Sequence, residues 1–168
     1  MNFTKQHAAV CGLFCPSCRN FIRTTEEPKR PEETLNQFNT PTEDTRCHGC
    51  RSDVRISYCN TCKLYYCSIE KGVDFCGQCS DYPCNDLKEF QATGAHRFEL
   101  WKAHEKIKKV GYDKWMKEMI DHYSCSNCRT INSAYDQQCR SCGYQPSNQY
   151  VAQHGQEIVD FLKKNQPQ

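Results

Sequence analysis

The sequence has little apolar material from which to build a large core. Hydrophobic residues make up 38% of its 168 residues, and its mean hydropathy is −0.85. This length allows one or two domains, but the composition leaves their stability to something besides hydrophobic burial. No apolar run approaches the roughly 18 residues of a membrane span, so we expect a soluble protein without membrane contact.

A secretion signal is also lacking. The segment from Met1 to Phe14 has no charged head, no long apolar stretch and no small-residue cleavage site. We therefore expect a cytoplasmic protein with reduced cysteines, because disulfides need an oxidising compartment. The odd number of cysteines, 15, supports this expectation, since an all-disulfide scheme would strand at least one thiol.

Motifs of zinc hydrolases and deaminases are absent as well. The sequence contains no H-E-x-x-H, and no H-x-E paired with P-C-x-x-C. Its C-x2-C pairs also lack the strand-to-helix setting in which thioredoxin-like exchange occurs. These absences favour a protein that is not an enzyme.

Cysteine is the residue that the sequence has in excess. Its 15 copies among 168 residues approach the roughly 8–10% that marks a covalent or metal scaffold in a small chain. Most of them form C-x2-C pairs, in one block from Cys11 to Cys84 and another from Cys125 to Cys142. The pairs are Cys15/Cys18, Cys47/Cys50, Cys59/Cys62, Cys76/Cys79, Cys125/Cys128 and Cys139/Cys142.

The second block predicts a zinc ribbon. Cys125-Ser-Asn-Cys128 and Cys139-Arg-Ser-Cys142 are separated by ten residues, which suit a short hairpin. Each pair forms a knuckle that presents two thiolates on one side of a tight turn, and two knuckles complete the tetrahedral shell of structural zinc. Gly143 suits the positive φ that often follows a knuckle, whereas Arg129 occupies the equivalent place after Cys128.

The first block offers eleven cysteines, a number that four-coordinate sites cannot share evenly. Three zinc ions would need a twelfth ligand such as His48, two would leave three cysteines over, and thiolate-bridged clusters are a further alternative. A histidine inside a knuckle is more often exposed than a ligand, so the pairing stays open. The candidate ligands of this block are Cys11, Cys15, Cys18, Cys47, Cys50, Cys59, Cys62, Cys67, Cys76, Cys79 and Cys84.

A short internal repeat lies in this first block. The string Tyr58-Cys59-x2-Cys62-x2-Tyr65-x-Cys67 recurs 17 residues later as Phe75-Cys76-x2-Cys79-x2-Tyr82-x-Cys84. Three cysteines and two aromatic residues coincide. The repeat predicts two similar metal loops, each with an aromatic residue covering its site.

Iron is the alternative to zinc in the first block, because thiolate ligands alone do not separate the two metals. Cys11-x3-Cys15-x2-Cys18 has the spacing by which radical enzymes using S-adenosylmethionine hold an iron–sulfur cluster. Those enzymes need a large β/α barrel, for which this chain has neither the length nor the pattern. A simpler iron–sulfur or thiol redox protein stays open.

Helices are expected around the cysteine-free centre. The patterns predict one or two turns over 86–91, a helix over 95–110 stopped by Gly111, an amphipathic helix over 112–123 and a last helix near 156–164. Another short helix would start at Pro31, between Cys18 and Cys47. The expected fold is a small metal-stabilised α+β protein. Its parts are an irregular cysteine-rich multi-metal domain (1–92), a helical connector (93–123), the zinc ribbon (124–146) and a C-terminal helix and tail (147–168).

The charge does not point to a nucleic-acid partner. The formal net charge is +2, but binding four zinc ions through 15 thiolates would change it to about −5, since the thiolates contribute −15 and the metals +8. The central helices carry a small basic excess that includes Arg97, which we interpret as a solvated helix face. His96 and His104 are expected to pack between helices and not to line a site.

Several strings together resemble one known family. They are Cys11-Gly-Leu-Phe-Cys15, Cys47-His-Gly-Cys50-Arg51, Lys71-Gly-Val-Asp-Phe-Cys76-Gly-Gln-Cys79-Ser-Asp-Tyr-Pro-Cys84, His96-Arg97, Trp115 and the ribbon. The family is a cysteine-rich prokaryotic one known only as a domain of unknown function, and the resemblance runs from about Val10 to Gly143. It implies metal binding and a bacterial or archaeal source, without an established activity. The ribbon departs from the family pattern at Ser126 and Arg129, where proline and glycine are usual.

These observations lead to one interpretation with two alternatives. We expect a zinc-binding protein with three or four ions, in which metal replaces a hydrophobic core and presents helices and loops to a macromolecular partner. That partner is expected to be a protein and not a nucleic acid. The alternatives are an iron–sulfur or thiol redox protein, and a metalloenzyme with an open metal site in the first block.

Overall fold

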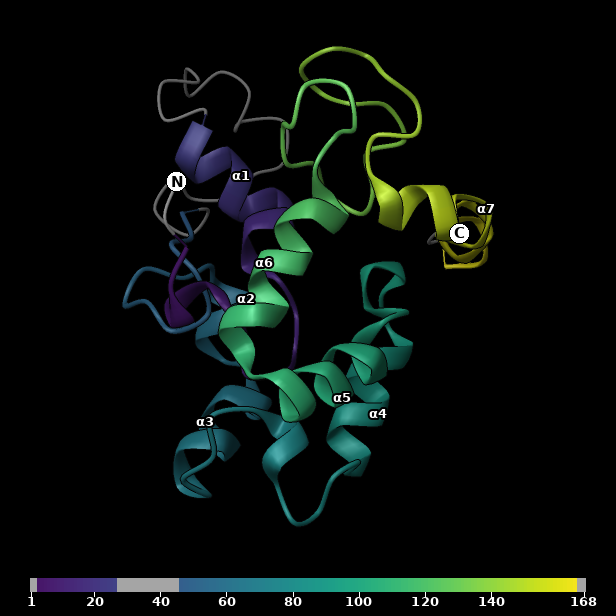
Figure 1. Cartoon of the computed structure of the whole chain (residues 1–168). Helices are drawn as coiled ribbons and strands as arrows, with labels where there is room; N and C mark the ends of the chain where they lie inside the picture. The colour runs from purple at the N-terminus through teal and green to yellow at the C-terminus, as the bar shows by residue number, and fades with distance from the viewer. Residues whose placement is uncertain (1–2, 27–45, 166–168) are drawn as a thin grey trace.

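The computed structural model describes residues 3–26 and 46–165, and within these ranges the chain is mostly helical (Figure 1). The short 3-10 turns are η1 (Lys5–His7), η2 (Cys15–Ser17), η6 (Cys76–Gln78) and η7 (Ala95–Arg97). The α-helices are α1 (Arg19–Glu26), α2 (Ser57–Asn60), α3 (Lys63–Glu70), α4 (Asn85–Ala92), α5 (Leu100–Val110), α6 (Tyr112–Tyr123) and α7 (Gln149–Lys164).

Strand structure is nearly absent from the described ranges. Extended segments pair only at two isolated bridges, between Ala8 and Phe14 and between Ser124 and Ile131. The expected α+β fold is therefore not confirmed, and the expected hairpin of the ribbon is reduced to the second bridge. Side-chain hydrogen bonds hold the chain beyond Ile131 instead, such as the one from the Ser133 N–H to Asp136 at 2.8 Å.

The central helices agree well with the sequence pattern. Helix α6 has the expected bounds, and it buries Trp115, Met116 and Tyr123 on one stripe. Helix α5 ends where expected, at Gly111, whose φ of 81° breaks the helical path. It begins at Leu100 and not at Ala95, because residues 95–97 form the tighter turn η7. The predicted turns over 86–91 are confirmed as α4.

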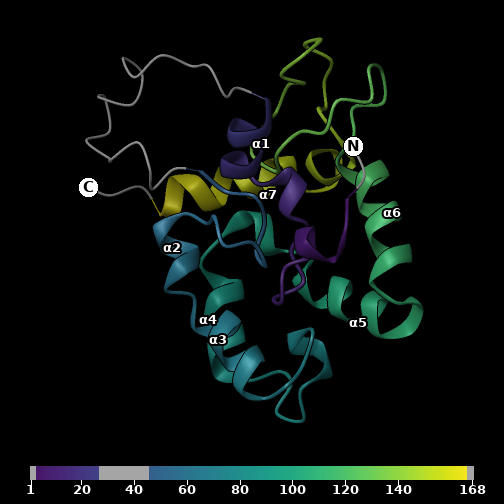
Figure 2. The same ribbon diagram turned by 90° about the vertical axis from the view of Figure 1, so that its left-hand side faces the viewer.

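Helix α7 is longer than expected. It begins at Gln149, seven residues before the predicted start, and the side chain of Asn148 caps it by accepting from the Val151 N–H at 2.9 Å. Tyr150 and Val151 extend the buried face of the helix beyond Gly155 toward its start. Figure 2 shows the length of α7, which Figure 1 views partly end-on.

Three helices of the cysteine-rich part were not predicted, the short α2 among them. Helix α1 follows directly on the turn of Cys15 and buries Phe21 and Ile22, and α3 occupies the first copy of the internal repeat. The second copy has only the 3-10 turn η6 before α4 begins at Asn85, because Pro83 cannot continue an α-helix. The prediction of two similar loops is therefore wrong. The helix predicted to start at Pro31 lies outside the described residues.

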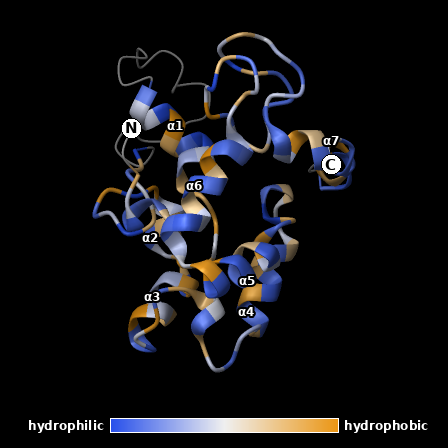
Figure 3. Ribbon diagram, viewed as in Figure 1, coloured by the Kyte–Doolittle hydropathy of each residue, from blue (hydrophilic) through white to orange (hydrophobic). Residues whose placement is uncertain are grey.

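An aromatic core ties distant parts of the chain together. Phe14 stacks on Tyr123 with ring centroids 5.9 Å apart, and Tyr123 stacks on Tyr150 at 5.5 Å. Trp115, at 1% exposure, meets the edge of Phe14. The cysteine-rich segment, α6 and α7 thus share one buried cluster. Figure 3 shows the corresponding pattern, in which hydrophobic positions on α5, α6 and α7 are interspersed among hydrophilic ones.

A second apolar cluster underlies the cysteine-rich part. It is formed by Val10, Leu64, Leu87 and Leu100 with Cys11, and it joins α3, α4 and α5. Further cysteines pack against it, so their thiols are partly shielded. In the described part of the chain, no helix has the length and apolar character needed to cross a membrane.

Candidate metal centre

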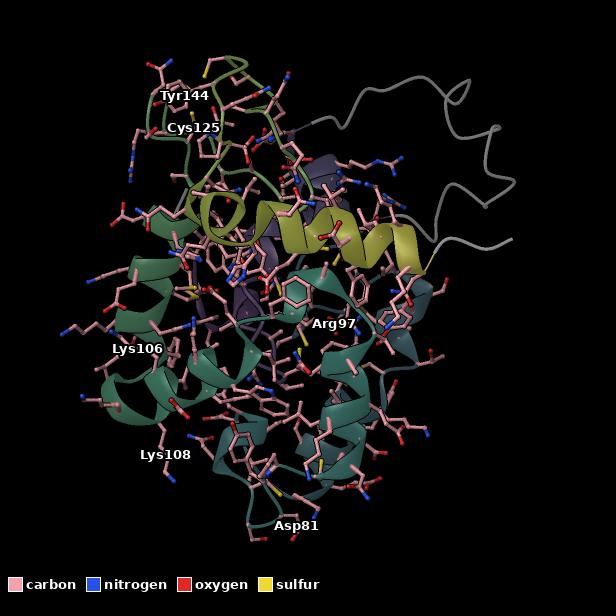
Figure 4. The ribbon with its side chains drawn as sticks, turned by 90° about the vertical axis from the view of Figure 1, so that its right-hand side faces the viewer. Asp81, Arg97, Lys106, Lys108, Cys125 and Tyr144 are labelled. Atoms are coloured by element: carbon pink, nitrogen blue, oxygen red, sulfur yellow. The ribbon has the colours of Figure 1, made fainter. Side chains whose placement is uncertain are left out.

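Four cysteines that follow α6 form the tightest group of possible metal ligands. The sulfur atoms of Cys125, Cys128, Cys139 and Cys142 lie within 4.8 Å of one another. In the described ranges, no other three cysteine, histidine or acidic side chains meet that condition. The segment runs through loops at one end of the molecule, where Figure 4 labels Cys125 and Tyr144.

The sulfur distances fit one tetrahedral metal ion. Sγ of Cys125 lies 3.7 Å from Sγ of Cys142, and Sγ of Cys128 lies 3.5 Å from Sγ of Cys139. A disulfide would need about 2.05 Å, and all 15 cysteines are free thiols. A tetrahedral shell with zinc–sulfur distances of about 2.3 Å places its sulfur atoms about 3.8 Å apart. The arrangement thus matches the donor set and the spacing that a metal ion requires.

The two knuckles share one backbone geometry. The N–H of Arg129 donates to the carbonyl of Cys125 at 2.9 Å, and the N–H of Gly143 donates to the carbonyl of Cys139 at 2.8 Å. Both donors have positive φ, 62° at Arg129 and 72° at Gly143. A non-glycine residue adopts this conformation at a cost of roughly 1–2 kcal/mol. Arg129, which occupies the place where glycine is usual, therefore affects the energy of the knuckle and leaves its geometry intact.

Asn132 links the two knuckles, and sequence reasoning missed it. Its side chain is fully buried and donates to the carbonyls of Thr130 at 2.8 Å and Ser147 at 3.2 Å. Its Oδ1 accepts from the N–H of Arg140, inside the second knuckle, at 3.0 Å. Its amide nitrogen also lies 3.6 Å from Sγ of Cys139. An asparagine in a polar loop carries no pattern that distinguishes it from exposed neighbours, so only the structure reveals this role.

The four thiols differ in burial and in acidity. Cys125 and Cys139 are buried, whereas Cys128 and Cys142 are exposed, so the site has one inner and one solvent-facing side. Desolvation raises the pKa of Cys125 to about 11, while the hydroxyl and backbone of Thr130 lower the pKa of Cys128 to about 6. Burial opposes ionisation of Cys139, but hydrogen bonds from the N–H groups of the second knuckle lower its pKa. A bound cation would compensate the resulting negative charge.

The eleven cysteines of the first block are less tightly gathered. No three of their sulfur atoms lie within 4.8 Å of one another. Cys11 and Cys47 are buried, and burial is the main cause of the raised pKa of Cys11 and of Cys15. Cys15 Sγ accepts from the N–H of Cys50 at 3.4 Å, which joins two of the predicted pairs. His48, the possible twelfth ligand, is exposed.

His104 lies between two cysteine-containing turns. Its Nδ1 accepts from the N–H of Gly77 at 3.2 Å, and burial lowers its pKa to about 4. A Cβ at Gly77 would approach this ring within 2.9 Å, and a Cβ at Gly12 within 3.1 Å. The imidazole therefore packs α5 against the turns that follow Cys11 and Cys76, in keeping with its predicted packing role.

Arg97 does not lie on a solvated helix face, so that part of the sequence interpretation is wrong. The side chain is 7% exposed, and its guanidinium donates to the Phe90 carbonyl at 2.5 Å and to His96 Nε2 at 3.2 Å. It also donates to the hydroxyl of Tyr58, the residue before Cys59, at 3.4 Å. Arg97 thus fastens the cysteine-rich part to the central helices. His96 bonds Tyr135 at 2.5 Å and packs as expected.

A polar network centred on Glu99 lies beside a small cavity between α5 and α6. Glu99 lies 2.8 Å from Nε2 of His122 and 3.2 Å from Nε2 of His154, which connects α5, α6 and α7. Desolvation opposes ionisation of Glu99, but the two histidines outweigh it and lower its pKa to about 2. The cavity measures about 190 Å³ and is lined mostly by apolar side chains, among them Leu100, Trp115 and Met119.

Comparison with known proteins gives a family match for the cysteine-rich part of the chain alone. Residues 7–89 match the model of a family described as protein of unknown function (DUF3795). The matched range contains all eleven cysteines of the first block and ends before α5 and the four-cysteine group. No curated protein and no solved structure matches the chain. The resemblance to a family of unknown function is thus confirmed for the first block, whereas its proposed extension to Gly143 is not part of this match.

Proposed function

We propose that this chain is a multi-zinc protein without catalytic activity of its own, in which metal holds the fold together for contact with a macromolecular partner. The four sulfur atoms of Cys125, Cys128, Cys139 and Cys142 carry the proposal, since they lie within 4.8 Å of one another. An all-thiolate tetrahedral shell is the donor set of closed, structural zinc sites. Such a site leaves no coordination position for a substrate.

The cysteines of the first block are proposed as ligands of further zinc ions. Eleven reduced thiols lie in this segment, whose apolar support is one small cluster of its own and a share of the aromatic core. Binding free energy of structural zinc counts as folding free energy, because the site does not exist in the unfolded chain. Metal would therefore supply the stability that this composition does not provide through burial.

A protein partner agrees better with the surface than a nucleic acid does. Side chains of Val54, Tyr58, Tyr66 and Ile69 are large, hydrophobic and exposed, and all belong to the segment around α2 and α3. Aromatic and aliphatic side chains of this kind are typical of the centres of protein interfaces. The zinc-loaded chain would in addition carry net negative charge, which disfavours contact with phosphate backbones.

The experiment that tests the metal claim compares Cys125→Ser with the neighbouring control Ser126→Ala. Both proteins are purified with zinc, and the ions per chain are counted by mass spectrometry under native conditions. The wild type and Ser126→Ala should carry equal numbers of ions, and Cys125→Ser should carry one fewer. Equal metal content in all three proteins would refute the proposal.

A further inference from the structure

Helices α3 and α4, with the turn between them, carry a second set of four cysteines. Cys67 lies in α3, Cys84 directly precedes α4, and the two helices pack on each other. Leu64, one turn before Cys67, and Leu87, one turn after Cys84, are buried in the same apolar cluster. Burial of these two leucines therefore holds the two helices that flank the cysteines against each other.

The turn from Cys76 to Cys79 completes the set. Cys76 packs against the same apolar cluster as Cys84. Its carbonyl accepts from the Cys79 N–H at 3.1 Å, which closes a tight turn with both thiols on it. The N–H of Asp81 then donates to Sγ of Cys79 at 3.5 Å. An N–H directed at cysteine sulfur stabilises the thiolate form that metal binding requires.

An ion pair connects the two halves of this set. Lys71, which follows α3, contacts the carboxylate of Asp81, which lies between Cys79 and Cys84. Both side chains are well exposed, so the pair adds little stability, but it shows that the two segments lie side by side.

We propose that Cys67, Cys76, Cys79 and Cys84 bind one zinc ion of their own, an inference that rests on the proposed function. Their spacing, with two residues between the middle pair, again offers one knuckle and two flanking thiols. Cys84 stands at the N-cap of α4, where the positive end of the helix favours a thiolate. The site lies near Asp81, which Figure 4 places at the opposite end of the molecule from Cys125.

Binding of one ion would require the four sulfur atoms to move closer together. No three of these sulfur atoms lie within 4.8 Å of one another, so the thiols would rotate about their Cα–Cβ bonds to meet the ion. The four thiols lose their protons to solvent, and four zinc–sulfur bonds form without oxidation or reduction. Lys71 stands near the resulting charge of −2. The assignment leaves seven cysteines of the first block for other sites.

The test counts zinc ions in single and double variants by native mass spectrometry of the full chain. Cys67→Ser and Cys84→Ser should each lose one ion, and the double variant Cys67→Ser/Cys84→Ser should also lose one, because both residues hold the same ion. Cys84→Ser/Cys125→Ser should lose two. Ser80→Ala, an exposed change in the same turn, should lose none. Cys84→His, which keeps a zinc donor, should retain the ion that Cys84→Ser loses.

The ion counts distinguish failure of this second site from failure of the proposed function. Loss of two ions from Cys67→Ser/Cys84→Ser would assign the two cysteines to different sites and overturn the inference. A full complement of ions in Cys84→Ser, with one lost from Cys125→Ser, would also overturn it while the proposed function stands. Retention of every ion in Cys125→Ser would refute the proposed function itself. If Cys84→Ser yields no folded protein, the ion count of Cys84→His with and without Cys67→Ser decides the assignment.

Discussion

Replacing Asn132 should weaken the four-cysteine centre, although this residue is not one of the four ligands. Asn132→Leu keeps the number and branching of the side-chain heavy atoms, but it removes the donors to the Thr130 and Ser147 carbonyls and the acceptor for the Arg140 N–H. All three bonds involve a side chain with no solvent exposure, so water cannot replace them. Leaving a buried polar group unpaired costs about 1–3 kcal/mol. We therefore expect a loss of about 3–5 kcal/mol for the three bonds together, after allowance for partial relaxation.

The matched control is Asn127→Ala. Asn127 lies in the first knuckle, is exposed, and makes one contact with metal-site sulfur, from Nδ2 to Cys142 Sγ at 3.5 Å. Its replacement should cost less than about 1 kcal/mol. Urea unfolding of the zinc-loaded proteins, read by circular dichroism and by chelator-accessible zinc, measures both changes. A loss below about 1 kcal/mol for Asn132→Leu would refute the reasoning that this side chain joins the knuckles.

Three further changes test other parts of the structure. Arg129→Gly should stabilise the first knuckle by about 0.5–1 kcal/mol, because glycine adopts positive φ without strain; a destabilised variant in urea unfolding would contradict this. Gly77→Ala should destabilise the protein by about 1–3 kcal/mol, because its Cβ would lie 2.9 Å from His104. The control Gly155→Ala in α7 should be neutral or stabilising in the same assay. Equal effects of the two substitutions would exclude the steric explanation. The pKa of His96 is lowered to about 4, chiefly by burial, so its contribution to stability is present above its ordinary pKa of 6.5 and lost as the pH falls toward 4. Between pH 6.5 and pH 4, the free energy of unfolding of the wild type should therefore fall by up to about 3 kcal/mol more than that of His96→Gln. Parallel pH profiles of stability for the two proteins would contradict this.

The sequence predicted the elements that depend on local pattern. The stripe of α6 is a period of apolar residues that any packing partner would bury, and Gly111 ends α5 through its own backbone freedom. The four cysteines of the second block are brought together by two short turns, whose spacing is visible in the sequence. These features required no knowledge of distant contacts.

Two of the missed features depend on residues far apart in the chain. The Arg97 side chain is buried because Phe90 and Tyr58 accept its hydrogen bonds, and nothing near Arg97 in the sequence indicates this. The two copies of the repeat look alike, yet α3 forms in one and Pro83 prevents a helix in the other. The early start of α7 depends on the burial of Tyr150 against Tyr123. Tertiary packing decides the burial of Arg97 and the start of α7, whereas the effect of Pro83 is local.

The grouping of the eleven cysteines of the first block into metal sites is only partly predictable from the sequence. Their number and spacing lead us to expect that they bind metal. Which of them bind the same ion depends on how α3, α4 and the intervening turn pack. The contact between Lys71 and Asp81 is one observation that narrows the choice, because it brings the segment after Cys67 to the segment before Cys84. Sequence spacing alone allows many other groupings.

The most direct test of the account is the metal content of the protein, purified without added metal and without air, together with its visible spectrum. A multi-zinc protein should contain three or four zinc ions per chain and give a colourless solution, since zinc has no redox chemistry and no visible absorption from its d electrons. Iron with acid-labile sulfide and a brown colour would contradict it and favour a redox protein.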